Sequence, residues 1–302
     1  MNHITSFAQL RAHLKGLNKV KRIAVANAVD EHSREAVLMA VENGFAEAYF
    51  IGNKAEIKIP PSMKAFLHLI HIIDIADPKA AAEEAVRMVR AGEADVLMKG
   101  LVTTDVLLKV VLDKKKGILP EGNVLSFCAV FEVPAYHKLL FVSDPAVIPS
   151  PTLEQRTAII KYMIEATQKF GVPKPKIALI HATEKPNPKI KYMQDYVDIL
   201  DIYRAGEFGK NVIIDGPLDI FLAVNKERGA IKNIPTPILG DADGLVFPNF
   251  ESANTFYKTV IAFANAETGG TLTGTSKPVV LTSRGDSTES KYNSIAMAAL
   301  LG

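Results

Sequence analysis

The sequence predicts an α/β protein of two domains, built mainly from parallel β-sheet. Apolar runs alternate with helix-length amphipathic segments through almost all of the 302 residues. Most of these runs are too continuously apolar to leave one face in water, which is typical of parallel strands covered by helices on both sides. Three prolines interrupt the alternation in "DPAVIPSP" (144–151), just before a long helical pattern, so we expect a domain boundary there.

The secondary structure follows from the periodicity, taken in chain order. We expect strands at 22–27, 48–52, 69–74, 95–100, 125–133, 139–144, 176–182, 211–216, 244–249, 269–274 and 278–283. We expect helices from about Ser6 and near 31–44, 78–91, 103–116, 152–170, 217–228, 251–266 and 287–300. Residues 1–144 with 283–302 should form the first domain and 145–282 the second, with the active-site cleft between them.

Composition and charge narrow the class of protein. The chain is 48% hydrophobic and 23% charged, as in ordinary globular proteins, and its net charge is +2. Neither nucleic acid nor a membrane surface is therefore an expected partner. The N-terminus lacks a signal-peptide pattern and no run reaches the roughly 20 apolar residues of a membrane span, so we expect a cytoplasmic protein. The lone Cys128 stands in the apolar run "VLSFCAVFEV", which predicts a buried structural thiol.

The first stretch that could carry chemistry is "MKGLVTTDVLLK", residues 98–109. A predicted strand ends at Lys99 and Gly100, and Thr103 and Thr104 begin a helix. Ligands of open α/β sheets bind beyond the carboxyl ends of strands, where a glycine admits close approach and a helix N-terminus attracts anions. The alternative is an ordinary turn with Thr103 or Thr104 as helix N-cap. The segment alone leaves both interpretations open.

The second stretch is "LTSRGDSTESK", residues 281–291. Asp286, Ser287 and Glu289 can cap the last helix, but a cap does not require Arg284. A guanidinium at the end of a strand, beside a helix N-terminus, suits a phosphate because it binds oxyanions through two hydrogen bonds. A salt bridge from Arg284 to an acid is the alternative. We favour anion binding.

The third stretch is "GDADGLVFPNFESANTFYK", residues 240–258. Asp241 and Asp243 precede a strand, and Asn254 and Lys258 share one face of the following helix. Two acids can mark a metal site, but further ligands are not evident, so turn-forming aspartates are the favoured interpretation. The seven histidines form no metal-binding or catalytic motif, and no metal is expected.

Five blocks together resemble the phosphate acetyltransferase/phosphate butyryltransferase family, and within it the butyryl branch. The blocks are "GEADVLMKGLVTTDVLLKVVL" (92–112), "LSFCAVFEVPAYHKLLFVSD" (125–144), "DGPLD" (215–219), the stretch 240–258 and "KPVVLTSRGDSTESKYNSIAMA" (277–298). The resemblance implies a two-domain fold like that of isocitrate and isopropylmalate dehydrogenases, usually as a homodimer or larger homo-oligomer. It also implies reversible transfer of a short acyl group, butyryl or similar, between CoA and inorganic phosphate. That transfer is direct, within a ternary complex, and yields an acyl phosphate, with CoA as a substrate and no permanently bound cofactor.

The resemblance also implies residue roles. Ser283 and Arg284 match the catalytic Ser-Arg pair: Arg284 would hold the phosphate, and Ser283 would hydrogen-bond the oxyanion of the tetrahedral intermediate. Ser290 stands where the acetyl branch has its aspartate base, and the butyryl branch also tends to have serine there. Substrate contacts are expected from Lys99, Gly100, Thr103, Ser126, Asn254, Lys258 and Ser290.

Four positions depart from the family pattern, with apolar residues in place of polar ones: Phe127, Ile148, Met193 and Phe221. They imply either a larger, more apolar acyl pocket or a reduced activity. The second hypothesis is therefore a catalytically reduced homologue that binds CoA or an acyl phosphate as a sensor or regulatory protein. A decarboxylating dehydrogenase of the same fold is disfavoured, because its metal-binding aspartates and basic triad are not found.

Overall fold

The computed structural model describes residues 2–283 and 285–302, which form two compact units. The first unit comprises residues 7–123 and 268–302; the second comprises residues 124–267 and the N-terminal residues up to Ser6. These limits differ from the expected boundaries after residues 144 and 282. The reason lies in strand pairing, because strands 126–132 and 140–143 belong to the sheet of the second unit and strand 279–280 to that of the first.

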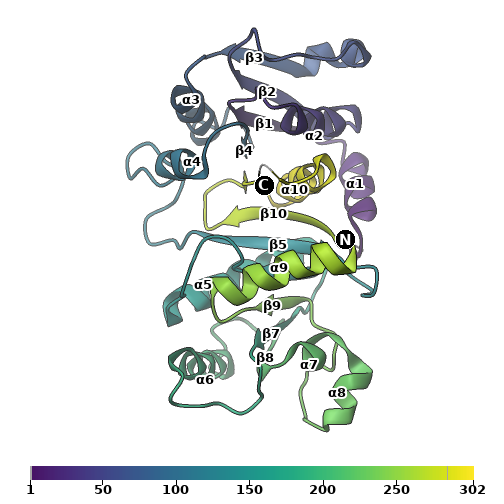
Figure 1. The fold of residues 1–302 in the computed structure, drawn as a ribbon, viewed down its shortest axis with the longest axis vertical. Helices are drawn as coiled ribbons and strands as arrows, with labels where there is room; N and C mark the ends of the chain where they lie inside the picture. Colours follow the sequence, from purple (N-terminus) through teal and green to yellow (C-terminus); the bar gives the residue numbers. More distant parts are fainter. Residues whose placement is uncertain (1, 284) are drawn as a thin grey trace. The chain divides into compact units, whose positions relative to one another are not determined.

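The first unit is a sheet flanked by helices (Figure 1). In chain order its elements are α1 (Phe7–Gly16), β1 (Lys21–Ala26), α2 (Glu31–Glu42), β2 (Ala46–Gly52), the 3₁₀ helix η1 (Pro61–Leu69), β3 (Ile70–Asp74), α3 (Pro78–Arg90), β4 (Val96–Lys99), α4 (Thr104–Val111), β10 (Glu267–Thr273), β11 (Val279–Val280) and α10 (Thr288–Leu301). Its strand order is β3-β2-β1-β4-β11-β10. Neighbours from β3 to β11 are parallel, and β10 is antiparallel to β11.

The second unit has the same construction. Its elements are β5 (Ser126–Glu132), β6 (Leu140–Ser143), α5 (Leu153–Lys169), β7 (Lys176–Ile180), α6 (Lys191–Arg204), β8 (Ile213–Leu218), α7 (Ile220–Val224), α8 (Lys226–Lys232), β9 (Gly244–Val246) and α9 (Phe250–Ala264). Its strand order is β5-β6-β9-β7-β8, parallel except for the β5–β6 pair. The predicted α/β class with mainly parallel strands is thus confirmed.

Buried strands and capped helices explain why these segments fold as they do. Residues 23–26 of β1 and 96–99 of β4 are buried throughout, as expected for strands covered on both faces. Asp30, Asp77 and Thr103 each accept a hydrogen bond from a backbone N–H in the first turn of the helix that follows. Each of these caps begins a helix just beyond a strand, which orients the polar groups at that edge of the sheet.

Each of the eleven predicted strands is present, whereas the helices differ in four places. The 3₁₀ helix η1 was not predicted, and α4 ends at Val111 rather than near residue 116. Helix α6 was missed: its buried face consists of Met193, Tyr196 and Ile199 within a mostly polar segment that follows two prolines. The predicted helix at 217–228 is divided at Asn225, which is extended (φ −138°) and whose side chain caps α8. No helix in the described part of the chain is long and apolar enough to cross a membrane.

Candidate active site

The parallel pairing of β4 with β11 places two of the singled-out stretches side by side. Val279 is paired with Leu97 and Val280 with Met98, so both strands end at the same edge of the first unit. Lys99, at the end of β4, is buried, and its Nζ donates to the carbonyl of Thr282 at 3.2 Å. Polar groups from both stretches therefore meet at the carboxyl edge of the sheet, where α/β proteins bind ligands.

Gly100 and Thr103 have structural roles that the sequence left open. A Cβ on Gly100 would lie 2.4 Å from the carbonyl oxygen of Asn27 and 2.7 Å from that of Ala26. The glycine is therefore required by the end of β1, whether or not a ligand approaches. The Thr103 hydroxyl accepts from the Val106 N–H at 3.4 Å, so Thr103 is the N-cap of α4.

Ser283 is exposed just beyond β11 and is held by short-range contacts. Its N–H donates to Asp286 Oδ2 at 2.7 Å, and its hydroxyl oxygen accepts from the Gly285 N–H at 3.3 Å. Arg284 lies outside the described residues. Asp286 thus binds the Ser283 backbone, and the N-cap of α10 is Ser287, which accepts from the Ser290 N–H at 3.1 Å.

Ser290 and Glu289, at the start of α10, are both engaged. The hydroxyls of Ser290 and Ser287 are 3.0 Å apart. Glu289, a candidate capping residue of the helix, forms an ion pair of 3.0 Å with Arg11 of α1. The structure therefore brings Lys99, Gly100, Thr103, Ser283 and Ser290 to one edge of the first unit.

Sequence reasoning missed Lys291 and Asp30 at the same edge. Lys291 is buried, and its Nζ donates to the Ser283 carbonyl at 2.9 Å. Asp30 caps α2 with Oδ1, while its Oδ2 is buried without a hydrogen-bond partner among the described residues. Within "TESKYNS" a lysine is expected to be a solvated side chain. Helix α10 (yellow) packs beside α2 (purple) (Figure 1), and Lys291 is buried, which the sequence pattern alone does not indicate.

Ser126, Asn254 and Lys258, the other predicted substrate contacts, belong to the second unit. Ser126 is fully buried, and its hydroxyl donates to Asp144 Oδ2 at 2.8 Å. Asn254 donates to the Pro145 carbonyl at 2.9 Å, and Lys258 is exposed one turn further along α9. Ser126 and Asn254 thus support the chain just beyond β6.

Asp144 is the centre of that support. Its carboxylate accepts from the Ser126 hydroxyl and from the backbone N–H groups of Phe127, Ala146, Val147 and Ile148, at 2.8 to 3.3 Å. Five donors around one buried carboxylate fix the turn that follows β6. Asp144 was not among the predicted site residues because its role depends on contacts from β5.

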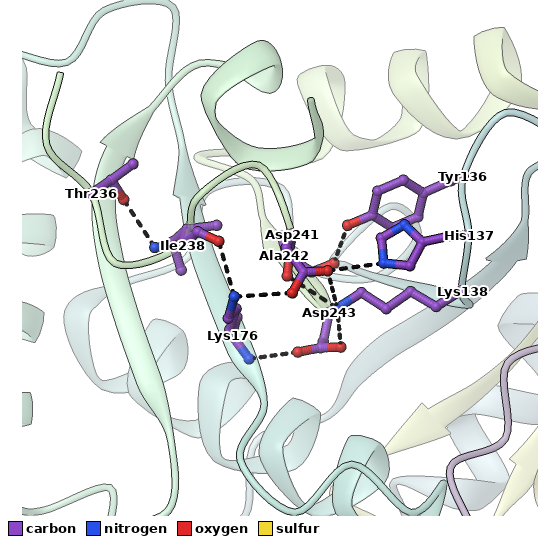
Figure 2. A network of polar contacts seen from close by, with 9 residues as sticks. All are labelled: Tyr136, His137, Lys138, Lys176, Thr236, Ile238, Asp241, Ala242 and Asp243. Carbon is purple, nitrogen blue, oxygen red and sulfur yellow. Dashed lines mark hydrogen bonds and ion pairs between the residues drawn. The ribbon is translucent and has the colours of Figure 1, made fainter. Parts of the chain in front are cut away.

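Asp241 and Asp243 are engaged in ion pairs (Figure 2). Lys138 is buried and reaches Asp241 at 2.9 Å and Asp243 at 2.7 Å, and Lys176 reaches Asp241 at 2.9 Å. His137 lies 3.0 Å from Asp241. Lys138 and Lys176 thus pair with the two carboxylates near the amino-terminal ends of β6, β7 and β9, in agreement with a structural role for the aspartates. The described residues contain no cluster of three His, Cys, Asp or Glu side chains able to hold a metal.

The four departures from the family pattern are mostly packing residues. Phe127, Ile148 and Met193 are buried, whereas Phe221 is 44% exposed with the Arg228 guanidinium 4.5 Å from its ring centroid. Cys128 is buried as predicted, and burial raises the pKa of its thiol to about 12. A thiol with that pKa is almost entirely protonated at neutral pH and is a poor nucleophile.

Comparison with known proteins decides the family. A model of the phosphate acetyl/butaryl transferase family matches residues 78–299. The phosphate butyryltransferase of Clostridium beijerinckii is 40% identical over 299 residues, which cover 98% of this chain and 97% of that protein. The chain belongs to the phosphate acetyl/butyryl transferase family. The expected enzyme class, an acyltransferase, is confirmed, and the comparisons give no support to a sensor without activity.

Another relative and two solved structures show how far the similarity in sequence and fold extends. The phosphate acetyltransferase of Thermotoga maritima is 36% identical over 93% of the chain and 95% of its own length. A branched-chain phosphotransacylase from Enterococcus faecalis superposes with a TM-score of 0.81 at 33% identity, covering 93% of this chain and 99% of that one. A 4-hydroxythreonine-4-phosphate dehydrogenase from Salmonella typhimurium, at 12% identity and a TM-score of 0.54, shares the fold alone. The predicted dehydrogenase-like fold is thereby confirmed.

Proposed function

We propose that this family member transfers a short acyl group, butyryl or a branched relative, reversibly between CoA and inorganic phosphate. The observation that carries the proposal is the exposed Ser283 at the end of β11, beside the buried ammonium groups of Lys99 and Lys291. A hydroxyl donor next to two buried positive charges suits an acyl transfer in which an oxyanion forms next to a phosphate.

The reaction is a direct transfer in a ternary complex. A phosphate oxygen attacks the thioester carbonyl, the carbonyl oxygen becomes an oxyanion, and collapse of the tetrahedral intermediate expels the CoA thiolate, which takes up a proton. Ser283 donates a hydrogen bond to the oxyanion, and Arg284 binds the phosphate through its guanidinium. The same steps in reverse form acyl-CoA from acyl phosphate.

Three further properties are part of the proposal. CoA acts as substrate, with no permanently bound cofactor or metal. The protein works in the cytoplasm as a homodimer or larger homo-oligomer, as the family resemblance implies. Thr103, Gly100 and Ser290 line the same edge as Ser283, and Ser126, Asn254 and Lys258 contribute from the second unit, Ser126 through Asp144.

A CoA-release assay across acetyl-, propionyl-, butyryl- and isobutyryl-CoA with phosphate tests the function. We expect the highest kcat/KM with a four-carbon acyl group. Arg284→Ala should abolish turnover with the fold intact, and Ser283→Ala should lower kcat about 10²–10³-fold, the usual cost of losing one oxyanion donor.

Arg204→Ala is the matched control, because Arg204 is an exposed arginine of α6 that forms an ion pair with Asp201 on the same helix. It should leave turnover unchanged. The absence of thiol release with every acyl-CoA, in both directions, would refute the function, and full activity of Arg284→Ala would refute the role of that residue.

A further inference from the structure

Lys291 is a buried ammonium group beside the predicted catalytic serine. Its side chain comes from the first turn of α10 and is 3% exposed. Nζ donates to the carbonyl oxygen of Ser283 at 2.9 Å and lies 3.5 Å from the Thr282 hydroxyl. Lys99, reaching from β4, donates to the next carbonyl back, that of Thr282. Two lysines thus hold successive carbonyls at the end of β11.

The charge of Lys291 has no direct ionic partner among the described residues. Carbonyl and hydroxyl oxygens are its hydrogen-bond partners, while Asp286 and Asp30 act on it at longer range. Of the other charged groups on the packed elements, Lys99 of β4 is cationic, and Arg11 of α1 is engaged with Glu289. Burial lowers the pKa of Lys291 more than the two aspartates raise it.

A buried charge without a counter-ion destabilises the fold, so its presence requires an explanation. Methionine would fill a similar volume without that cost. The cost is offset when an anion binds nearby, because the ammonium and the anion then neutralise each other. Because Lys291 is bonded to the backbone of Ser283, the proposed catalytic serine, we expect this anion to be the substrate phosphate.

We propose that Lys291 is a positioning residue for phosphate, which fixes the Ser283 peptide and supplies positive charge to the anion site. The inference rests on the proposed function. Both backbone polar groups of Ser283 are hydrogen-bonded to charged side chains: its N–H donates to Asp286, and its carbonyl accepts from Lys291. The Ser283 peptide is thereby held by two charged groups, and the Lys291 ammonium adds a positive charge at the place where the phosphate would bind.

The test uses Lys291→Met in the full-length protein. The KM for phosphate should rise on the order of tenfold, because the anion site loses a buried positive charge and the Ser283 peptide loses a charged hydrogen-bond donor. The KM for acyl-CoA should change less than about twofold. Lys291→Arg, which retains the charge, should restore most of the phosphate affinity.

The melting temperature and the pH dependence of the KM for phosphate distinguish this role from that of a lysine that only stabilises the fold. Lys291→Met should not lower the melting temperature, because it removes an uncompensated buried charge. In the wild type the KM for phosphate should rise as the pH approaches the lowered pKa of Lys291 from below, because the ammonium loses its proton; the Met variant should lack this rise. Lys64→Met, which removes an exposed lysine of η1, is the matched control and should match the wild type.

Binding of inorganic phosphate separates this inference from the proposed function. Phosphate should raise the melting temperature of the wild type and of Lys64→Met, and raise that of Lys291→Met much less. This difference supports the inference even if the wild type releases no thiol, an outcome that would refute the proposed function alone. An equal phosphate shift in all three proteins, or an unchanged KM for phosphate in Lys291→Met, would overturn the inference.

Discussion

The buried charged side chains of this protein differ in their ionic and hydrogen-bond partners, and this difference indicates their roles. Lys138 is buried between two carboxylates and forms ion pairs with both, so its charge is compensated within the fold. Asp144 accepts hydrogen bonds from five donors, although burial still raises the pKa of its carboxyl group. Lys291 has oxygens of neutral groups as its hydrogen-bond partners. The first two side chains therefore stabilise structure, whereas the third is suited to an external anion.

The ion pairs of Asp241 predict a pH-dependent stability. Partial burial opposes its ionisation, but hydrogen bonds from Lys138 and Lys176 outweigh burial and lower the pKa of Asp241 to about 2. The carboxylate thus contributes stability above pH 4, which is lost as the pH falls from about 4 to about 2. Because Asp241 is partly exposed, we expect a contribution of about 1 kcal/mol.

Urea unfolding of the wild type and Asp241→Asn checks this expectation. The free energy of unfolding should differ by about 1 kcal/mol at pH 6, and the difference should shrink towards zero near pH 2. Asp201→Asn, in an exposed pair on α6, is the control and should show little difference at any pH. A difference for Asp241→Asn that persists near pH 2 would contradict the assigned role of ionisation.

At the scale of elements, helix caps set where the polar groups lie. Helix α5 begins with a capping box, in which the Thr152 hydroxyl accepts from the Gln155 N–H while the Gln155 side chain accepts from the Thr152 N–H. Thr152→Ala removes one half of this exchange. We expect it to lower the free energy of unfolding by about 1 kcal/mol, measured by urea titration.

Thr152→Ser retains the hydroxyl and is the matched control, expected to fall within about 0.5 kcal/mol of the wild type. Equal stability of the Ala and Ser variants would show that the cap contributes nothing. Neither variant should alter the KM for phosphate, because the Thr152 hydroxyl serves the helix cap and Thr152 is not among the proposed substrate contacts.

At the scale of the whole molecule, the last turn of α9 exposes a large apolar side chain, that of Phe263. Of the fifteen residues of α9, Ala253 alone is classed as buried, and Phe263 is 85% exposed. Between Thr255 and Ala264, Lys258 is the single charged residue. The last turn of α9, residues 260–264, carries no charge and exposes Phe263, so it is suited to burial against a second copy of the chain, in line with the proposed homo-oligomer.

Phe263→Asp should therefore shift the protein towards a monomer of 32.8 kDa in sedimentation experiments at micromolar concentration. Ile231→Asp is the control, because Ile231 of α8 is 83% exposed and equally apolar, yet lies on a helix with no buried residue and several charges. A monomeric wild type, or an unchanged mass of Phe263→Asp, would contradict this use of α9.

Periodicity and motifs within single segments determined much of this protein. Each of the eleven strands and most of the helices follow from patterns within one local stretch of sequence, since the residues of a strand themselves show whether both of its faces are buried. The acyltransferase class follows from five blocks that together, in their order along the chain, resemble one family. Helices α6 and η1 are exceptions; in α6 a short buried face among polar residues gives a weak signal.

Tertiary structure alone decided which polar side chains are free to act. The Ser126 hydroxyl donates to Asp144, and the Thr103 hydroxyl caps the helix that it begins. Asp241 and Asp243 form ion pairs with lysines from distant segments. From the sequence Lys291 is expected at the surface, but in the packed α10 its side chain is directed inward and donates to the Ser283 carbonyl. Sequence patterns specify local conformation, whereas the availability of a charge or hydroxyl depends on partners that are brought near only by the fold.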